Sequence, residues 1–124
     1  MSGPGSPALT ARVRAALQEW KYALLVRRSG LFDVEFYRAQ GPRDPTAGRS
    51  PILHYLRHGA AAGLDPSPFF DTSFYVERYP EVAASGKNPL VHYIRHGLRE
   101  GRAACPRFEA ADAARSLGRF DPFG

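Results

Sequence analysis

The chain has 124 residues, of which 44% are hydrophobic, and 17 basic against 12 acidic side chains give it a formal net charge of +5. Its length allows one domain with a modest core, its single cysteine excludes an internal disulfide, and no apolar run reaches the ~18 residues of a membrane span. The basic balance favours polyanionic partners such as nucleic acid, anionic lipid surfaces or acidic glycans. With no sign of an oxidising compartment, the expected location is cytoplasmic.

The first predicted element is a helix over residues 8–30, after a disordered lead-in at residues 1–7. Arg27 and Arg28 suit the negative end of its dipole, and Gly30 is the expected stop. Trp20 and Tyr22 are interpreted as core and rim aromatics, and the helix as a cap on the adjoining segment of the chain. Apolar residues recur at helical spacing along it: Leu9, Val13, Leu17, Trp20 and Leu24.

The rest of the chain duplicates itself at an interval of 38 residues, and 14 of the 38 aligned positions are identical. This gives repeat 1 at residues 31–68, repeat 2 at 69–107, and a degenerate third-repeat start and tail at 108–124. Units this short cannot bury an apolar face alone and stack on a neighbour. The predicted fold is all-α, a short-helix tandem repeat in a small α-solenoid-like array with an N-terminal capping helix. The structural motif comprises Phe32, Asp33, Phe36, Tyr37, His54, Tyr55 and Gly59, matched by Phe70, Asp71, Phe74, Tyr75, His92, Tyr93 and Gly97.

Each repeat opens with a Phe-Asp pair before a short aromatic helix. Asp33 and Asp71 are predicted N-caps, because a carboxylate there can accept from backbone N–H groups two or three residues on. In repeat 2, Pro80 suits a first helical position and Gly86 a C-terminal stop. The corresponding element of repeat 1 is expected to be looser, because Pro45 disfavours helical geometry in the residue before it.

The third element of each repeat begins with a predicted cap residue and a proline, Ser50-Pro51 and Asn88-Pro89. The helices after these prolines should run for about two turns and end at Gly59 and Gly97. Apolar residues share one side of each at i, i+3 and i+4 spacing. The predicted core residues are therefore Ile52, Tyr55, Leu56, Leu90, Tyr93 and Ile94.

Histidines stand four apart in both repeats, so each pair can share a helix face. Four imidazoles could serve a metal, yet no carboxylate or cysteine cluster accompanies them and tyrosines replace the glutamate of an HExxH motif. We predict no metal and no cofactor. His54 and His92 are expected to bond backbone groups between repeats, and His58 and His96 to lie in solvent.

No nucleophile elbow or glycine-rich phosphate loop is present, so no catalytic residue is predicted. Aromatic and arginine side chains form either the seam between stacked repeats, which is the favoured interpretation, or a surface that stacks on sugars or bases. Cys105 is interpreted as an incidental small residue. The candidate binding residues are Arg57, Arg95, His58, His96, Tyr79 and Arg99.

Repeat 2 carries two runs with a distinctive combined spacing. They are Phe70-Asp71-x-x-Phe74-Tyr75-x-x-x-Tyr79-Pro80-Glu81-Val82-Ala83 and Asn88-Pro89-Leu90-x-His92-Tyr93-x-x-x-Gly97-x-x-Glu100-Gly101-Arg102. With these runs, repeat 2 resembles a tandem bacterial module that is attached to glycosyltransferases and other proteins of surface-polysaccharide synthesis. The resemblance spans about residues 29–108, but repeat 1 departs from it at residues 42–45 and 62–64. It implies a non-catalytic module for assembly or binding, accessory to or a segment of a glycosyltransferase, with a protein or glycan partner.

Two alternatives remain open beside this hypothesis. The charge and the interleaved arginines and aromatics also suit a small basic nucleic-acid-binding protein, which is less favoured because no groove-reading motif accompanies them. The paired histidines suit a metal enzyme, which the absence of further ligand residues disfavours.

Overall fold

The computed structural model describes residues 7–42 and 45–106, and about two thirds of these residues lie in helices. An isolated bridge between Ser67 and Phe70 is the one β-type pairing among them. The expectations for residues 1–6 and 108–124 lie outside the described residues. The elements are α1 (Pro7–Ser29), α2 (Val34–Ala39), α3 (Pro45–Arg49), α4 (Pro51–His54), the π-helical turn η1 (Tyr55–Gly59), α5 (Thr72–Arg78), α6 (Pro80–Ala84), α7 (Pro89–His92) and the π-helical turn η2 (Tyr93–Gly97).

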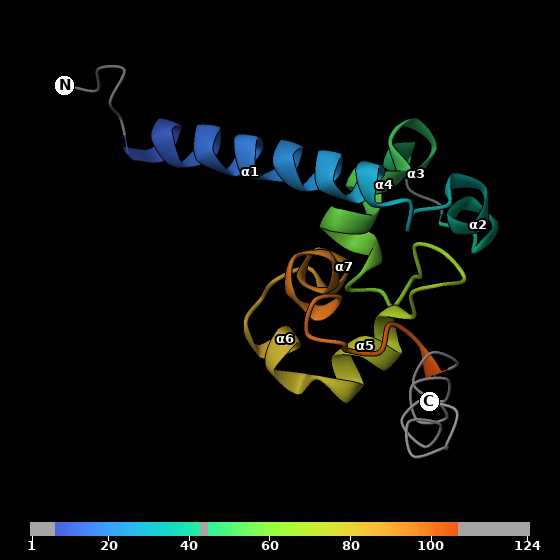
Figure 1. The fold of residues 1–124 in the computed structure, drawn as a ribbon. Coiled ribbons are helices and arrows are strands. Elements are labelled where there is room, and N and C mark those ends of the chain that lie inside the picture. Colours follow the sequence, from blue (N-terminus) through green and yellow to red (C-terminus); the bar gives the residue numbers. More distant parts are fainter. Residues whose placement is uncertain (1–6, 43–44, 107–124) are drawn as a thin grey trace, which may run out of the picture.

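Helix α1 is a long rod whose C-terminal half lies on the remaining helices, while its N-terminal half extends beyond them (Figure 1). It contacts α4, α7 and η2. Val26 is fully buried, and Tyr22 and Leu25 pack against the core. The helix ends as predicted, because Gly30 adopts a positive φ of 75° that reverses the chain.

The interpretation of Trp20 as a core aromatic was wrong, because it lies on a stripe of apolar side chains of α1 that does not face the core. Leu9, Val13, Leu17 and Trp20 are 50, 51, 53 and 61% exposed. At about 100° per residue, Tyr22 lies roughly opposite the centre of this stripe, and it is the Tyr22 side that meets the other helices. Spacing reveals that a helix has an apolar side, but the neighbouring elements decide which side is covered.

The predicted caps of the first element are confirmed in both repeats. The carboxylate of Asp33 accepts from Phe36 N at 3.0 Å, and that of Asp71 accepts from Phe74 N at 2.9 Å. The backbone N–H groups of the same aspartates donate to Pro66 O and Ala104 O at 2.8 and 2.9 Å. The side chain of each aspartate thus caps a helix. The backbone N–H of the same aspartate joins the start of its repeat to a residue near the end of that repeat, 33 positions later.

The core is built largely from aromatic rings, with Tyr37, Tyr55, Phe70 and Tyr75 fully buried. Tyr37 and Tyr55 meet edge to face with ring centroids 5.9 Å apart. Of the six predicted core residues, three are buried and three are partly buried against the cluster. The buried ones are Tyr55, Leu90 and Tyr93, and the partly buried ones are Ile52, Leu56 and Ile94.

A buried hydrogen bond joins the two repeats. Thr72 Oγ1 donates to Leu64 O at 2.6 Å, which uses the one hydroxyl proton of the threonine. Tyr55 Oη therefore donates to Thr72 Oγ1, at 2.9 Å. Burial raises the pKa of the Tyr55 phenol, which keeps it protonated as this donor role requires.

The proline-led helices follow the sequence in part. Helix α6 begins at Pro80, and Gly86 stops it with a φ of 73°, as predicted. Helix α3 begins at Pro45, and the residue expected to be non-helical before it lies outside the described residues. Asn88 caps α7 through bonds from Leu90 N and Val91 N to its side chain.

Ser50 occupies the N-cap position of α4 and Pro51 follows it, as predicted, but the Ser50 side chain makes no capping hydrogen bond. The stop predicted at Gly59 is also incomplete. The π-helical turn ends there, but Ala60 keeps right-handed helical geometry, and the chain reverses only at Gly63, with a φ of 81°. The equivalent reversal in repeat 2 is at Gly101.

Candidate functional site

Two tyrosine–histidine pairs stand at the centre of the molecule. The Tyr37 hydroxyl lies 2.5 Å from His54 Nδ1, and the Tyr75 hydroxyl lies 2.8 Å from His92 Nδ1. Burial raises the pKa of Tyr37 to about 12, and it also raises that of Tyr75. The phenols are therefore protonated near neutral pH, and the tautomer of each imidazole sets which partner donates in the hydrogen bond.

These pairs correct the expectation that His54 and His92 bond backbone groups between repeats. Each histidine instead pairs with a tyrosine 17 residues earlier in the same repeat. The tyrosines come from α2 and α5, and the histidines from the last residues of α4 and α7. The duplicated residue types thus serve the interior of each repeat.

Gly59 and Gly97 complete the same arrangement. A Cβ atom at Gly59 would overlap the Tyr37 hydroxyl, and one at Gly97 would overlap the Tyr75 hydroxyl. Neither glycine has a positive φ, so close approach of the phenol is the reason for glycine at these positions. The Phe-Asp-x-x-Phe-Tyr and His-Tyr-x-Arg-His-Gly motifs are therefore two halves of one packing unit.

The second histidine of each repeat lies at the surface, as predicted. The His54 and His58 ring centroids are 5.7 Å apart, and those of His92 and His96 are 5.4 Å apart. Within residues 7–42 and 45–106, no three histidine, cysteine, aspartate or glutamate side chains gather in an arrangement that could hold a metal ion. Each repeat brings two imidazoles together without a third ligand.

Among the predicted binding residues, Arg57 ties η1 to α1. Its Nε and Nη2 atoms donate to Glu19 Oε2 and Oε1 at 2.7 and 2.6 Å, in a two-pronged ion pair. The hydrogen bond from Arg57 lowers the pKa of Glu19. Nothing in the sequence pattern indicates this pair, because Glu19 lies 38 residues away and outside both repeats.

Arg95, the repeat 2 equivalent of Arg57, occupies a different environment. It is exposed and lines a groove of about 320 Å³ beside α1, together with Gln18, Lys21, Tyr22 and Leu25. Helix α1 therefore borders the candidate residues of both repeats. The nearby cations of Lys21 and Arg95 give this groove a basic character.

Tyr79 is enclosed by cations in repeat 2. The Arg102 guanidinium lies 4.5 Å from the ring centroid and that of Arg78 lies 5.1 Å from it, while the Tyr79 hydroxyl accepts from Ala103 N at 2.9 Å. Tyr79 thus joins the middle of repeat 2 to its C-terminal end at Ala103. These contacts occupy the hydroxyl and leave the ring half-buried.

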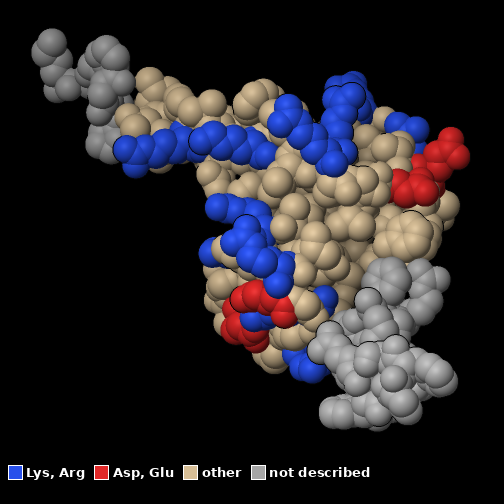
Figure 2. All heavy atoms as spheres, in the orientation of Figure 1, with Lys and Arg blue, Asp and Glu red and all other residues tan. Residues whose placement is uncertain are grey.

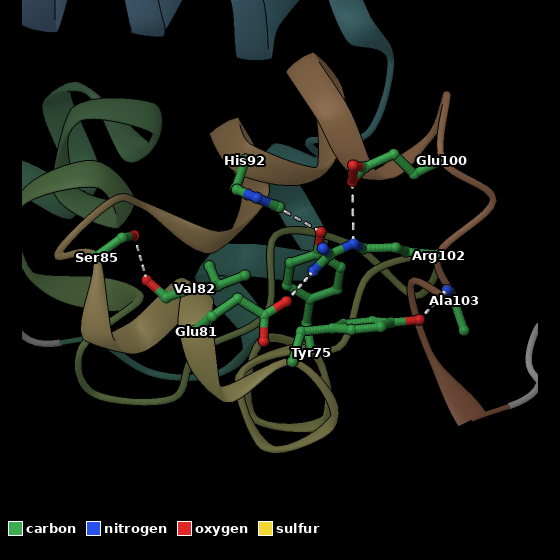
Figure 3. Close-up of polar contacts among 9 residues, drawn as sticks. Tyr75, Glu81, Val82, Ser85, His92, Glu100, Arg102 and Ala103 are labelled. Atoms are coloured by element: carbon green, nitrogen blue, oxygen red, sulfur yellow. Dashed lines mark hydrogen bonds and ion pairs between the residues drawn. The ribbon is translucent and has the colours of Figure 1, made fainter.

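Arg102 is itself held by two carboxylates, as Figure 3 shows. Arg102 Nη1 lies 2.6 Å from Glu81 Oε1, and Arg102 Nε lies 3.1 Å from Glu100 Oε1. Repeat 1 has Leu64 at the position of Arg102, so the two repeats differ here in the sequence and in their contacts. The Glu-Gly-Arg run could have indicated a local ion pair, since its charges stand two residues apart.

Two further grooves lie on the described surface. One, of about 350 Å³, runs between α1 and α4 and includes Trp20, Leu24 and Ile52. The other, of about 370 Å³, lies where the repeats meet and includes Leu56, Val76 and Lys87. None of the six predicted binding residues lines either groove. Arg99, the remaining one, is exposed on the turn after η2.

The arrangement engages the inner imidazole of each repeat and leaves the outer one exposed. The inner imidazoles are engaged by phenols whose pKa values are raised, and in the described part of the chain the outer ones lack the further ligands that a metal site needs. Within the described ranges, no helix is both long and apolar enough to cross a bilayer. No protein-family model, curated protein or solved structure matches the chain.

Proposed function

We propose that the chain is a non-catalytic helical repeat module that mediates assembly or binding in bacterial cell-surface polysaccharide synthesis, as an accessory to or a segment of a glycosyltransferase. The observation that carries the non-catalytic role is the pair of bonds from Tyr37 to His54 and from Tyr75 to His92. These bonds support the proposal because they engage the duplicated tyrosines and inner histidines in packing contacts. The polysaccharide context rests on the resemblance of repeat 2 to the bacterial module.

We also propose that the two copies are units of a tandem array. Support comes from contacts that recur at the 38-residue interval, such as the bonds from Asp33 N to Pro66 O and from Asp71 N to Ala104 O. The bond between Tyr55 and Thr72 then acts as the junction between units. In such an array each unit contacts its neighbours and leaves a ribbon of equivalent surface residues for a partner.

The partner surface in this proposal is formed by the exposed side chains that come after each π-helical tyrosine. Arg57 with His58, and Arg95 with His96, are exposed at equivalent positions in the two repeats. Guanidinium and imidazole groups donate hydrogen bonds to hydroxyl, carboxylate and backbone oxygen atoms. Such a surface fits a glycosyltransferase domain or an acidic glycan.

A genetic test separates this role from catalysis. Deleting the coding sequence should lower the surface polysaccharide of its own cells, and re-expressing the wild-type chain should restore it. The variant H58Q/R95Q/H96Q should fail to restore it, whereas K87Q, which also changes an exposed polar side chain, should succeed. Arg57 is kept because it holds α1. Sugar transfer by the purified chain alone would contradict the proposal.

The second candidate is nucleic-acid binding, which is favoured by the basic side chains that line α1 in Figure 2. Affinity carried by phosphate contacts falls steeply with salt, because each contact releases a counterion. Fluorescence anisotropy with labelled DNA and RNA oligonucleotides at low and high salt tests it. Binding that is undetectable at low salt would remove this candidate.

A further inference from the structure

The outward face of α1 combines a strip of apolar side chains with cations along its edges. Leu9, Val13, Leu17 and Trp20 fall within about 80° of one another around the helix and extend over about 16 Å of its axis. Each of them is at least half exposed. We call these four residues the apolar stripe. An exposed strip of this kind on a helix marks an interaction surface.

Basic residues lie on both sides of the apolar stripe. By helical position, Arg12 borders one edge, and Arg14 and Lys21 border the other. Figure 2 shows basic side chains along α1, whereas the acidic ones in this view lie over other elements. Glu19 is the one acidic residue of α1, and its charge is paired with Arg57. The exposed half of the helix is therefore cationic.

The position of α1 makes the apolar stripe accessible to a flat surface. Tyr22, on the side opposite the stripe, packs against the core, and Figure 1 shows the N-terminal half of α1 extending beyond the other helices. At its Trp20 end the stripe borders the groove that α1 shares with Ile52 and Leu53. Toward the N-terminus of α1 the stripe is open to a planar surface.

We propose that the apolar stripe of α1 inserts into the interface of an anionic phospholipid bilayer, while Arg12, Arg14 and Lys21 lie at the level of the headgroups. A helix with a Leu- and Trp-bearing face edged by Lys and Arg binds in the plane of such a surface. Long basic side chains keep their charges in the headgroup region while their stems cover apolar surface. This inference does not depend on the polysaccharide role.

The charge pattern distinguishes a bilayer from other occupants. A second copy pairing through the same stripe would bring the cations of Arg12, Arg14 and Lys21 close to those of its partner, and like charges repel. A nucleic acid would satisfy these cations but would leave Leu9, Val13 and Leu17 in water. An anionic bilayer provides both an apolar phase and negative charge.

Trp20 is the single tryptophan of the chain, so its fluorescence reports on the apolar stripe directly. Vesicles of equimolar phosphatidylglycerol and phosphatidylcholine should shift its emission to shorter wavelength and carry the full-length chain with them in flotation. Vesicles of phosphatidylcholine alone should do neither. Raising the salt concentration should weaken the binding, because salt screens the attraction between the cations and the lipid headgroups.

Variants test the two parts of the surface separately. L9Q/V13Q/L17Q should lower the affinity for anionic vesicles at least tenfold, whereas L98Q should retain it, although Leu98 is also an exposed leucine, at 62%. R12Q/R14Q should lower the affinity roughly 25-fold, since each cation near an anionic surface contributes about a fivefold factor. K87Q/R99Q removes two exposed charges elsewhere and should have a much smaller effect. Far-UV circular dichroism verifies that each variant is folded.

Four results would overturn the proposal. The first is a Trp20 emission that anionic vesicles leave unchanged. The second is equal vesicle binding by the wild-type chain and by L9Q/V13Q/L17Q. The third is a shift to shorter wavelength that depends on protein concentration without vesicles and accompanies a mass of twice 13.7 kDa in sedimentation, which would assign the stripe to a second copy. Tight binding to an oligonucleotide that itself shifts the emission would assign it to nucleic acid.

Discussion

The Tyr37 hydroxyl occupies the space that a side chain at Gly59 would need, and it lies 2.5 Å from His54 Nδ1. Replacing Gly59 with alanine should therefore displace the phenol and destabilise the fold by about 1–3 kcal/mol, as overpacking does in other cores. G48A is the matched control, because nothing lies within 4 Å of its Cβ position in α3. It should be neutral or slightly stabilising, and urea unfolding compares the two.

The same site allows a double-mutant cycle. In a Y37F background the hydroxyl oxygen is gone, so G59A should cost less than it does beside tyrosine. Y37F alone should destabilise the fold by roughly 1–3 kcal/mol, because His54 Nδ1 is left buried without its hydrogen-bond partner. Equal costs of G59A in both backgrounds would mean that the two residues do not interact.

Equivalent positions in the two repeats should respond differently to loss of a helix cap. Asn88 accepts from Leu90 N and Val91 N, so N88A should lower the free energy of unfolding by about 1 kcal/mol. The Ser50 side chain makes no such bond, and S50A should lie within about 0.5 kcal/mol of the wild type. Thermal unfolding of both variants measures the difference. A larger effect at Ser50 than at Asn88 would contradict it.

Stability should fall as the pH drops through the histidine range. Burial lowers the pKa of His92 below its usual 6.5, and the positive charges of Arg102, His96 and Lys87 lower it further, against an opposing effect of Glu100. The unfolded chain then binds more protons than the folded one, so the free energy of unfolding decreases from about pH 7.5 toward pH 5.5. Urea unfolding across this range gives the slope.

The contribution of His92 to that slope can be isolated by substitution. H92Q removes the imidazole and should flatten the dependence on pH, although it also lowers the overall stability through loss of the bond to Tyr75. R99Q removes an exposed charge but no imidazole and should leave the slope close to that of the wild type. A slope unchanged by H92Q would show that other groups cause the pH dependence.

The ion pair between Glu19 and Arg57 should restrict α1 locally. Because it is largely exposed, its loss in R57Q should change the melting temperature little. The fluorescence anisotropy of the adjacent Trp20 should nevertheless fall, since α1 loses a contact with η1 at that point. E35Q, which changes an exposed glutamate in α2, is the control and should leave the anisotropy unchanged.

The local features of the fold could be predicted from the sequence because their causes act within one helical turn. Asp33 and Asp71 cap helices by bonds to residues three positions away, and Gly30 stops α1 through its own backbone conformation. The exposure of His58 and His96 likewise agreed with their spacing along short helices. At Ser50 the position of the cap was predicted but a side-chain hydrogen bond is missing, because such a bond also requires a side-chain orientation that spacing does not specify.

By itself the sequence determined the 38-residue duplication, the helical character and most helix ends, all of which depend on short-range hydrogen bonds and φ preferences. Only the tertiary structure decided that Trp20 points outward, that His54 meets Tyr37 and that Glu19 meets Arg57. Those relationships join residues 17 or more positions apart, or depend on which neighbour covers a helix. Burial is a property of the whole packed molecule, because a side chain leaves water only where another element lies against it.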